Sequence, residues 1–199
     1  MKIILASGSP RRKEILENMN LKFDIIKSSI EETIIENENP KDLVKRLSYE
    51  KAFDVAKKNK GSIVIGSDTI VVLENQILGK PNDKKEAFEM LKNMSGKEHS
   101  VITGISMIYL DENKEIKDFC VSKVKFKELS DKDINAYIET GEYKDKAGAY
   151  GIQGIGSILV EYIKGDYFNI VGFPISYASE IFKNEFGINL FEINKNRFI

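Results

Sequence analysis

The segment SIVIGSDTIVVL, residues 62–73, restricts the fold of this chain more than any other. Isoleucine and valine dominate it, and these β-branched side chains suit a buried, pleated strand better than a helix. Segments with the apolar spacing of amphipathic helices stand on either side, at residues 40–59 and 83–94. A buried strand between such helices is typical of a sheet that helices cover. We therefore predict an α/β fold in which 62–73 is a central strand, interrupted at residues 66–68.

The N-terminal part of the chain repeats this alternation. Residues 2–6, KIILA, predict a short buried strand. Ser9 can cap the helix that follows, and Pro10 can occupy its first position, because proline needs no hydrogen-bond acceptor there. Residues 22–30, KFDIIKSSI, predict a second strand. The first half of the chain is thus expected to alternate strand and helix.

The C-terminal part predicts longer strands and an antiparallel component. Residues 99–110 and 119–129 have strand composition and are joined by a charged turn. A capping-box pattern at residues 130–133 begins a helix, and Pro174 begins the last one. The glycine-dense segment 147–165 predicts a loop and hairpin. An α/β or α+β fold with a mixed sheet fits these elements, and the lack of repeats or linkers predicts a single domain over residues 1–199.

Charge and cysteine content exclude several classes of partner. Thirty basic residues against thirty-one acidic ones give a net charge of −1, so no overall field attracts nucleic acid or an anionic membrane. No apolar run approaches the roughly 18 residues that a membrane span needs. There is one cysteine, Cys120. We expect a cytoplasmic protein without nucleic-acid or membrane partners.

Three consecutive cations, Arg11, Arg12 and Lys13, stand at the expected start of the first helix. Acidic residues are usual there, because the first turn exposes N–H groups and carries partial positive charge. With the hydroxyls of Ser7 and Ser9, these groups predict a cradle for phosphate. A solvated basic helix end is the alternative.

Asp68, Lys51 and Lys80 are further candidates. Asp68 follows an apolar run, where it could bind a hard cation or accept a proton from water; the alternative is a turn aspartate. Lys51 falls on the apolar stripe of its helix, so its ammonium either meets a buried anion or extends to solvent. Lys80 lies between a glycine and a proline, which suggests a loop of fixed conformation; an exposed turn lysine is the alternative.

Other polar residues carry weaker signals. Glu31 and Glu32 could supply oxygen ligands to a metal, or could simply be solvated. Gln153 lies among glycines that let a backbone approach a ligand, and its amide could read a base edge; a relaxed hairpin is the alternative. His99 is the only histidine, and no nucleophile-elbow motif accompanies it, so a catalytic triad is not expected.

Taken together, these motifs resemble the Maf family of nucleoside triphosphate pyrophosphatases over nearly the whole chain. The matching segments, in order, are LASGSPRRKEIL, IEET, RLSYEKA, GSDTIVV, ILGKP, MSGKEHSVITG, DKAGAYGIQG and GDYFNIVGFP. The resemblance implies an elongated, bent mixed sheet flanked by helices, with two lobes and a central cleft. It also implies hydrolysis of a nucleoside triphosphate to the monophosphate and pyrophosphate. The reaction would use a divalent cation, with Mg²⁺ expected and Mn²⁺ as the alternative. The resemblance further implies a chain able to form a homodimer.

Within the family, three motifs are similar to those of the branch that acts on dTTP and UTP, with modified pyrimidine nucleotides as further substrates. These motifs are SPRR, the DT that follows GS in GSDT, and GIQG. The family name comes from septum formation, so a nucleotide-sensing regulator of cell division without significant hydrolysis is the alternative function.

The resemblance also assigns roles to individual residues. Asp68 matches the catalytic proton acceptor, and the metal would be bound by Asp68 and Glu32. The positions that match substrate-binding positions of the family are Ser9, Arg11, Arg12, Lys51, Thr69, Lys80 and Gln153, of which Arg11, Thr69 and Gln153 stand at specificity positions. Glu31 replaces the aspartate that the family usually has before Glu32.

Overall fold

The computed structural model describes residues 1–33, 35 and 37–194. Its elements are β1 (Lys2–Leu5), α1 (Pro10–Asn18), β2 (Asp24–Ile25), α2 (Pro40–Ala56), β3 (Ser62–Leu73), β4 (Gln76–Leu78), α3 (Lys84–Met94), β5 (Glu98–Tyr109), η1 (Leu110–Glu112), β6 (Lys114–Phe126), α4 (Asp131–Glu139), η2 (Ala147–Ala149), η3 (Gly154–Leu159), β7 (Val160–Lys164), α5 (Tyr167–Val171), α6 (Ile175–Phe186) and α7 (Leu190–Ile193). No helix in this described part of the chain is long and apolar enough to cross a membrane.

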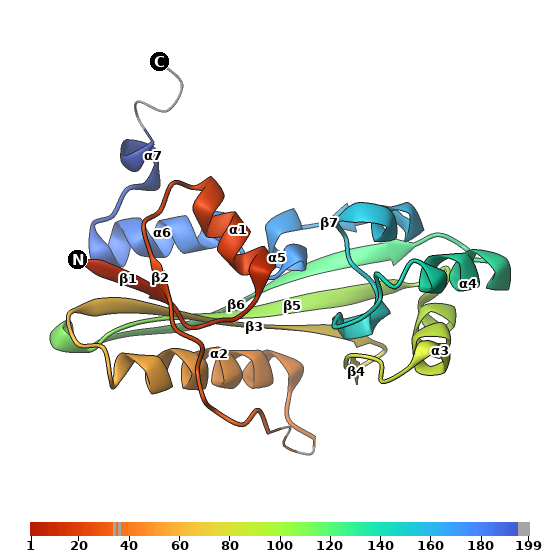
Figure 1. Ribbon diagram of the computed structural model, residues 1–199, viewed down its shortest axis with the longest axis horizontal. Helices are drawn as coiled ribbons and strands as arrows, with labels where there is room; N and C mark the ends of the chain where they lie inside the picture. The colour runs from red at the N-terminus through yellow and green to blue at the C-terminus, as the bar shows by residue number, and fades with distance from the viewer. Residues whose placement is uncertain (34, 36, 195–199) are drawn as a thin grey trace. The chain divides into compact units, whose positions relative to one another are not determined.

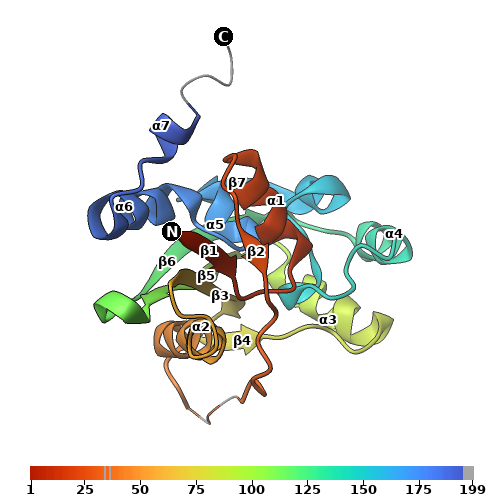
Figure 2. The same ribbon diagram turned by 60° about the vertical axis from the view of Figure 1, so that its left-hand side comes forward.

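The strands form a mixed sheet in the order β2-β1-β3-β5-β6-β7, with β4 paired to β3. β1 runs parallel to both β2 and β3, whereas β3 with β4 and β6 with β7 are antiparallel pairs. Helix α2 covers one face of β1 and β3, and α1 and α6 cover the other (Figure 1, Figure 2). The predicted α/β fold with a mixed sheet flanked by helices is confirmed.

The chain forms two compact units. The first comprises residues 1–68, 103–120 and the described residues from 172 onward, and the second comprises 69–102 and 121–171. The division passes through β3, β5 and β6. The single domain over 1–199, the elongated bent shape and the central cleft stay predictions.

Each unit has its own apolar core. In the first, α2 packs on β1 and β3 through a buried cluster of Ile4, Ala6, Ala52, Val55, Ala56, Val64 and Ile108. In the second, α3 and α4 contribute to a larger cluster, which includes Leu91, Met94, Val124, Phe126, Ile134, Tyr137, Ile138 and Tyr150. Close packing in these two cores keeps the strands and helices that carry the candidate site residues rigid.

Helix starts follow the caps that the sequence contains. The Asn39 side chain accepts a hydrogen bond of 2.9 Å from the Lys41 N–H at the start of α2, and Pro40 follows the cap. Ser130 and Asp133 form the predicted capping box of α4. Pro10 begins α1 as predicted, with Ser9 at the cap position, but the Ser9 side chain makes no capping hydrogen bond. The prediction that Ser9 caps α1 is wrong in this respect.

Four strand predictions differ from the structure, and one of them is that for 119–129, since β6 runs from Lys114 to Phe126. β3 is continuous from Ser62 to Leu73 and is not interrupted at 66–68. The predicted strand 22–30 is reduced to two residues, Asp24 and Ile25, because only these pair with β1. The glycine-dense segment forms the turns η2 and η3 and no hairpin of its own, since β7 pairs with β6 instead.

Candidate active site

Helix α2 lies unusually close to the sheet because two strand residues have no side chain. A Cβ atom added at Gly66 of β3 would lie 2.0 Å from the Ser48 carbonyl oxygen and 2.9 Å from the Ala52 Cβ. One added at Gly104 of β5 would lie 2.0 Å from the Val44 carbonyl oxygen. Only glycine permits this approach. Gly66 therefore serves close packing here and does not break the strand.

Asp68 lies two residues after Gly66, so its side chain is on the same face of β3 as α2. Lys51 of α2 meets it there, with 2.6 Å between Lys51 Nζ and Asp68 Oδ1. Both side chains are buried, with exposed fractions of 9% and 11%. The structure thus favours the buried-anion interpretation of Lys51 over extension to solvent, and Asp68 is a mid-strand residue and not a turn aspartate.

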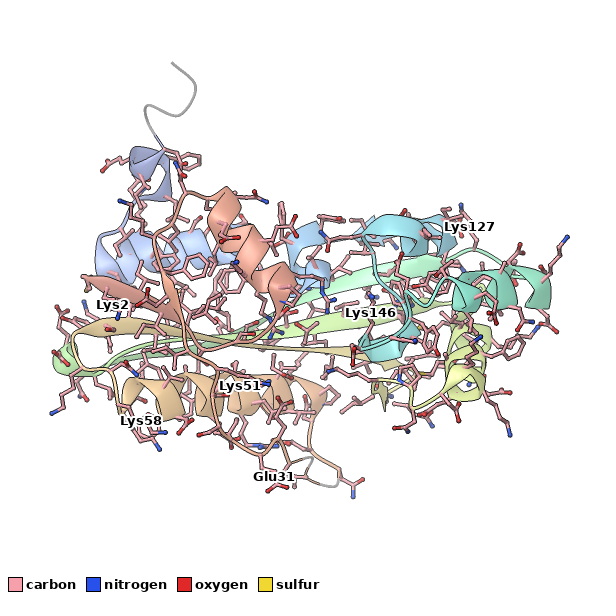
Figure 3. All side chains as sticks on the ribbon, viewed as in Figure 1. Lys2, Glu31, Lys51, Lys58, Lys127 and Lys146 are labelled. Atoms are coloured by element: carbon pink, nitrogen blue, oxygen red, sulfur yellow. The ribbon has the colours of Figure 1, made fainter. Side chains whose placement is uncertain are left out.

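Glu32 also reaches the Lys51 ammonium. Its Oε1 lies 2.9 Å from Lys51 Nζ, although 54% of the Glu32 side chain is exposed. The ammonium therefore lies within ion-pair distance of two carboxylates, those of Glu32 and Asp68. Figure 3 shows Lys51 on α2 and Glu31 on the segment that passes this helix. The structure brings together Glu32, Lys51 and Asp68, which lie far apart in the sequence.

Arg12 is held on the other side of β3. Its Nε donates a hydrogen bond of 2.8 Å to the Gly172 carbonyl oxygen, and its Nη1 donates one of 3.1 Å to Ser7 Oγ. Ser67 Oγ donates to the same Gly172 carbonyl at 3.1 Å, and the Ser9 N–H donates to Ser7 Oγ at 3.2 Å. The loop between β1 and α1 is thereby tied to β3 and to the residue that precedes Phe173.

Electrostatics couple this loop to the carboxylates. Burial lowers the pKa of the Arg12 guanidinium, and Asp68 and Glu32 oppose that effect, while the neighbouring Arg11 adds to it. The first turn of α1 contains no acidic residue. The Arg12 guanidinium therefore lies within electrostatic range of Asp68 and of Arg11, at the start of a helix whose first turn suits an anion such as phosphate.

The remaining candidates belong to the second unit. Thr69 is half-buried on β3, directly after Asp68, whereas Lys80 and Gln153 are exposed. The Gly148 N–H donates a hydrogen bond of 3.0 Å to the Gly79 carbonyl oxygen. The loop that carries Lys80 is therefore held against the glycine-dense segment that leads to Gln153.

Comparison with known proteins identifies the family. The family model described as "Maf-like protein" matches residues 2–185. The chain belongs to the Maf family. The resemblance seen in the sequence motifs is thus confirmed.

Curated relatives match the chain at high identity. A protein of Clostridioides difficile (strain 630) named "dTTP/UTP pyrophosphatase" is 60% identical, with 96% of this chain and 98% of that protein covered. A protein of the same name from Thermoanaerobacter sp. (strain X514) is 53% identical, with 96% and 100% covered. Among solved structures, the Ham1 protein of Staphylococcus aureus has a TM-score of 0.50, with 17% identity and 81% of each chain covered. That likeness supports the fold alone.

The carboxylates of this Maf-family chain suit a divalent cation that phosphates help to bind. Among the described residues, no three His, Cys, Asp or Glu side chains gather in a way that could hold a metal. Two carboxylates, those of Glu32 and Asp68, converge on Lys51. Magnesium is commonly held by one or two carboxylates together with substrate phosphates. The donor set thus fits a cation that arrives with a nucleotide.

His99 lies in the core of the second unit. It is 2% exposed, its Nε2 lies 2.8 Å from the Tyr150 hydroxyl, and its ring packs edge-on against Phe126. Burial lowers the pKa of the His99 ring to about 4. These contacts are those of a core residue.

Sequence reasoning missed two contributors to the site. The Gly172 carbonyl binds both Arg12 and Ser67, but a main-chain oxygen has no residue-type signal. Arg46 holds the segment that carries Glu32, through a hydrogen bond of 2.9 Å from Nη2 to the Thr33 carbonyl oxygen. The only available signal was its place in RLSYEKA, five residues before Lys51.

Proposed function

We propose that this Maf-family chain is a nucleoside triphosphate pyrophosphatase that hydrolyses dTTP and UTP, with modified pyrimidine nucleotides as further substrates. The substrate class rests on the name of relatives that are 60% and 53% identical over nearly their whole length. The observation that carries the chemistry is the buried contact of 2.6 Å between Lys51 and Asp68, which Glu32 joins. The nucleotide-sensing regulator without hydrolysis is not favoured, because these relatives are named as hydrolases.

The basic groups would bind the triphosphate. Arg11 and Arg12 at the start of α1, with the Ser9 hydroxyl, supply hydrogen-bond donors of the kind that bind phosphate oxygens. Lys51 and Lys80 add two ammonium groups. Positioning and charge neutralisation provide most of the catalysis in phosphoryl chemistry, so this set suits the proposed reaction.

Asp68 and Glu32 would hold the divalent cation together with phosphate oxygens. We infer Mg²⁺, with Mn²⁺ as the alternative, because hard cations prefer carboxylate and phosphate oxygens. When bound, the ion supplies charge neutralisation for the leaving pyrophosphate. Lys51, which donates to Asp68, orients that carboxylate within the site.

We assign the proton transfer to Asp68. A water oxygen attacks the α-phosphorus, the bond between that phosphorus and the oxygen bridging to the β-phosphate breaks, and pyrophosphate leaves with the bond's electron pair. The water proton moves to the Asp68 carboxylate. Arg11, Thr69 and Gln153 would select the nucleotide, with the Gln153 amide able to pair with a base edge.

Two further proposals concern the setting of the enzyme. A chain with one cysteine forms no internal disulfide, which suits the reducing cytoplasm. The Maf resemblance suggests a homodimer.

The decisive test is pyrophosphate release from a panel of dTTP, UTP, CTP, GTP and methylated GTP, with and without Mg²⁺. We expect metal-dependent release from dTTP and UTP, reduced at least 100-fold in Asp68→Asn. Asp24→Asn is the matched control, because Asp24 is an exposed partner of Lys2 and should leave release unchanged. Full turnover by Asp68→Asn would overturn the assignment of Asp68, and nucleotide binding without release would favour the sensor.

A further inference from the structure

The segment that carries Glu32 is tied to helix α2 at both ends. At the upstream end, Asp54 Oδ2 accepts hydrogen bonds of 2.9 Å from both the N–H and the hydroxyl of Ser29. At the downstream end, Arg46 Nη2 donates one of 2.9 Å to the Thr33 carbonyl oxygen. Residues 29–33, which we call the Glu32 segment, are therefore attached to the same helix that carries Lys51.

Arg46 is itself fixed by a fork of charge-assisted bonds. Its Nε lies 2.8 Å from Glu38 Oε1 and its Nη2 lies 2.6 Å from Glu38 Oε2, a bidentate pair. Its Nη1 donates to Glu50 at 3.2 Å. The Arg46 and Glu38 side chains are 22% and 13% exposed, so water competes with these bonds less than at an open surface. The Arg46 hydrogen bonds lower the pKa of Glu38, and those from Ser29 lower the pKa of Asp54 to about 2.

Glu32 depends on such support because it has little of its own. Its residue lies outside any helix or strand, and more than half of its side chain is exposed. A carboxylate on an irregular segment keeps a defined position only when the backbone around it is held. Helix α2 can provide that hold, since Gly66 and Gly104 let it rest directly on β3 and β5.

We propose that Arg46 is a positioning residue, which with Asp54 holds the Glu32 segment so that Glu32 remains beside Lys51 and Asp68. This inference rests on the proposed function, because it assigns Arg46 to the same metal-dependent site. Arginine suits position 46 better than lysine, since a lysine cannot bind both Glu38 oxygens and the Thr33 carbonyl with one planar group. Residues that orient metal ligands typically change metal affinity or activity by 10–100-fold when mutated.

The test compares Arg46→Gln with Lys45→Gln. Lys45 is the neighbouring residue on α2, and its variant also loses an ion pair, the contact of 2.8 Å with Asp42, but no hydrogen bond or ion pair joins Lys45 to the described residues 29–33. Three measurements are made: amide hydrogen exchange over 29–33, Mn²⁺ binding by electron paramagnetic resonance with an α,β-imido analogue of dTTP, and the Mg²⁺ concentration that gives half-maximal pyrophosphate release.

For Arg46→Gln we expect faster exchange in the Glu32 segment, with α2 itself unchanged. Mn²⁺ binding should weaken, and the half-maximal Mg²⁺ concentration should rise, each about 10-fold or more. Excess Mg²⁺ should restore much of the turnover, a rescue that a mere folding defect would not show. Lys45→Gln should match the parent protein in all three.

The same metal dependence and the same exchange as the parent would overturn the proposal. If Arg46→Gln does not fold, Arg46→Lys and Glu38→Gln provide weaker versions of the same comparison, and both should show intermediate shifts. Failure of the proposed function gives a different result: the parent protein itself would release no pyrophosphate, while hydrogen exchange would still report whether Arg46 holds the segment.

Discussion

Lys51 is a buried cation whose ammonium lies between two carboxylates, so it has both a structural and a chemical role. Sequence pattern alone placed it on the apolar stripe of its helix but could not choose between burial and extension to solvent, because a lysine stem is compatible with both. The deciding fact is the contact of 2.6 Å with Asp68, which depends on how α2 packs on β3. Burial of a charge can be inferred from sequence only when its partner is known.

Lys51 and Lys80 should respond differently to the same substitution. We expect Lys51→Met and Lys80→Met each to lower kcat/KM by roughly 100-fold to 1,000-fold, because each removes a charge from a polyanionic transition state. Only Lys51→Met should also destabilise the fold, by about 3–5 kcal/mol, since it leaves Asp68 buried without its cation. Lys80 is exposed, so its variant should keep the parent melting temperature. Steady-state kinetics and thermal unfolding check this. A fully active Lys80→Met would favour the alternative interpretation, in which Lys80 is an exposed turn residue outside the site.

Helix α2 and strand β3 show what can be predicted for an element and what cannot. The start of α2 agrees with the predicted segment 40–59, and Asn39 and Pro40 define it because capping is a local interaction. The expected break in β3 was wrong, because glycine has two uses in a strand, and the sequence does not distinguish a break from a close approach. That distinction needs the position of Ser48, which belongs to another element.

The close approach of α2 makes Gly66 a sensitive position. Gly66→Ala would place a Cβ 2.0 Å from the Ser48 carbonyl oxygen, so the helix must shift and carry Lys51 with it. We expect a loss of about 1–3 kcal/mol, or roughly 2–12 °C in melting temperature, together with lower turnover. Gly79→Ala is the control, because nothing lies within 4 Å of its added Cβ. An unshifted melting temperature for Gly66→Ala, measured by calorimetry, would contradict this account of the packing.

At the scale of the whole molecule, the site depends on pairings that no local pattern contains. Arg12 binds the carbonyl of Gly172, which is 160 residues away in the sequence, and the sheet order places β3 between β1 and β5. The family resemblance supplied the identities of the site residues, and helix and strand patterns supplied the fold class. The contacts that hold the residues in place, such as Arg46 with Thr33, came from the structure alone.

Folding stability should decrease as pH falls from 6.5 toward 4, because of the buried His99 ring. Its folded-state pKa is lowered to about 4 from an ordinary value of 6.5, so between these values the unfolded chain binds the proton more readily than the folded chain does. Folding stability is therefore greatest above pH 6.5 and decreases as pH falls toward 4, by up to about 3 kcal/mol for this group.

Denaturant unfolding at pH 7, 6, 5 and 4 measures the decrease. In His99→Gln the decrease between pH 6.5 and 4.5 should disappear, whatever the absolute stability of the variant. The carboxylates of Asp54 and Glu98, whose pKa values are lowered to about 2 from ordinary values of 3.8 and 4.5, cost stability as pH falls through and below those ordinary values, so the comparison with His99→Gln is confined to pH 6.5–4.5. An unchanged slope in His99→Gln would show that another group takes up the proton.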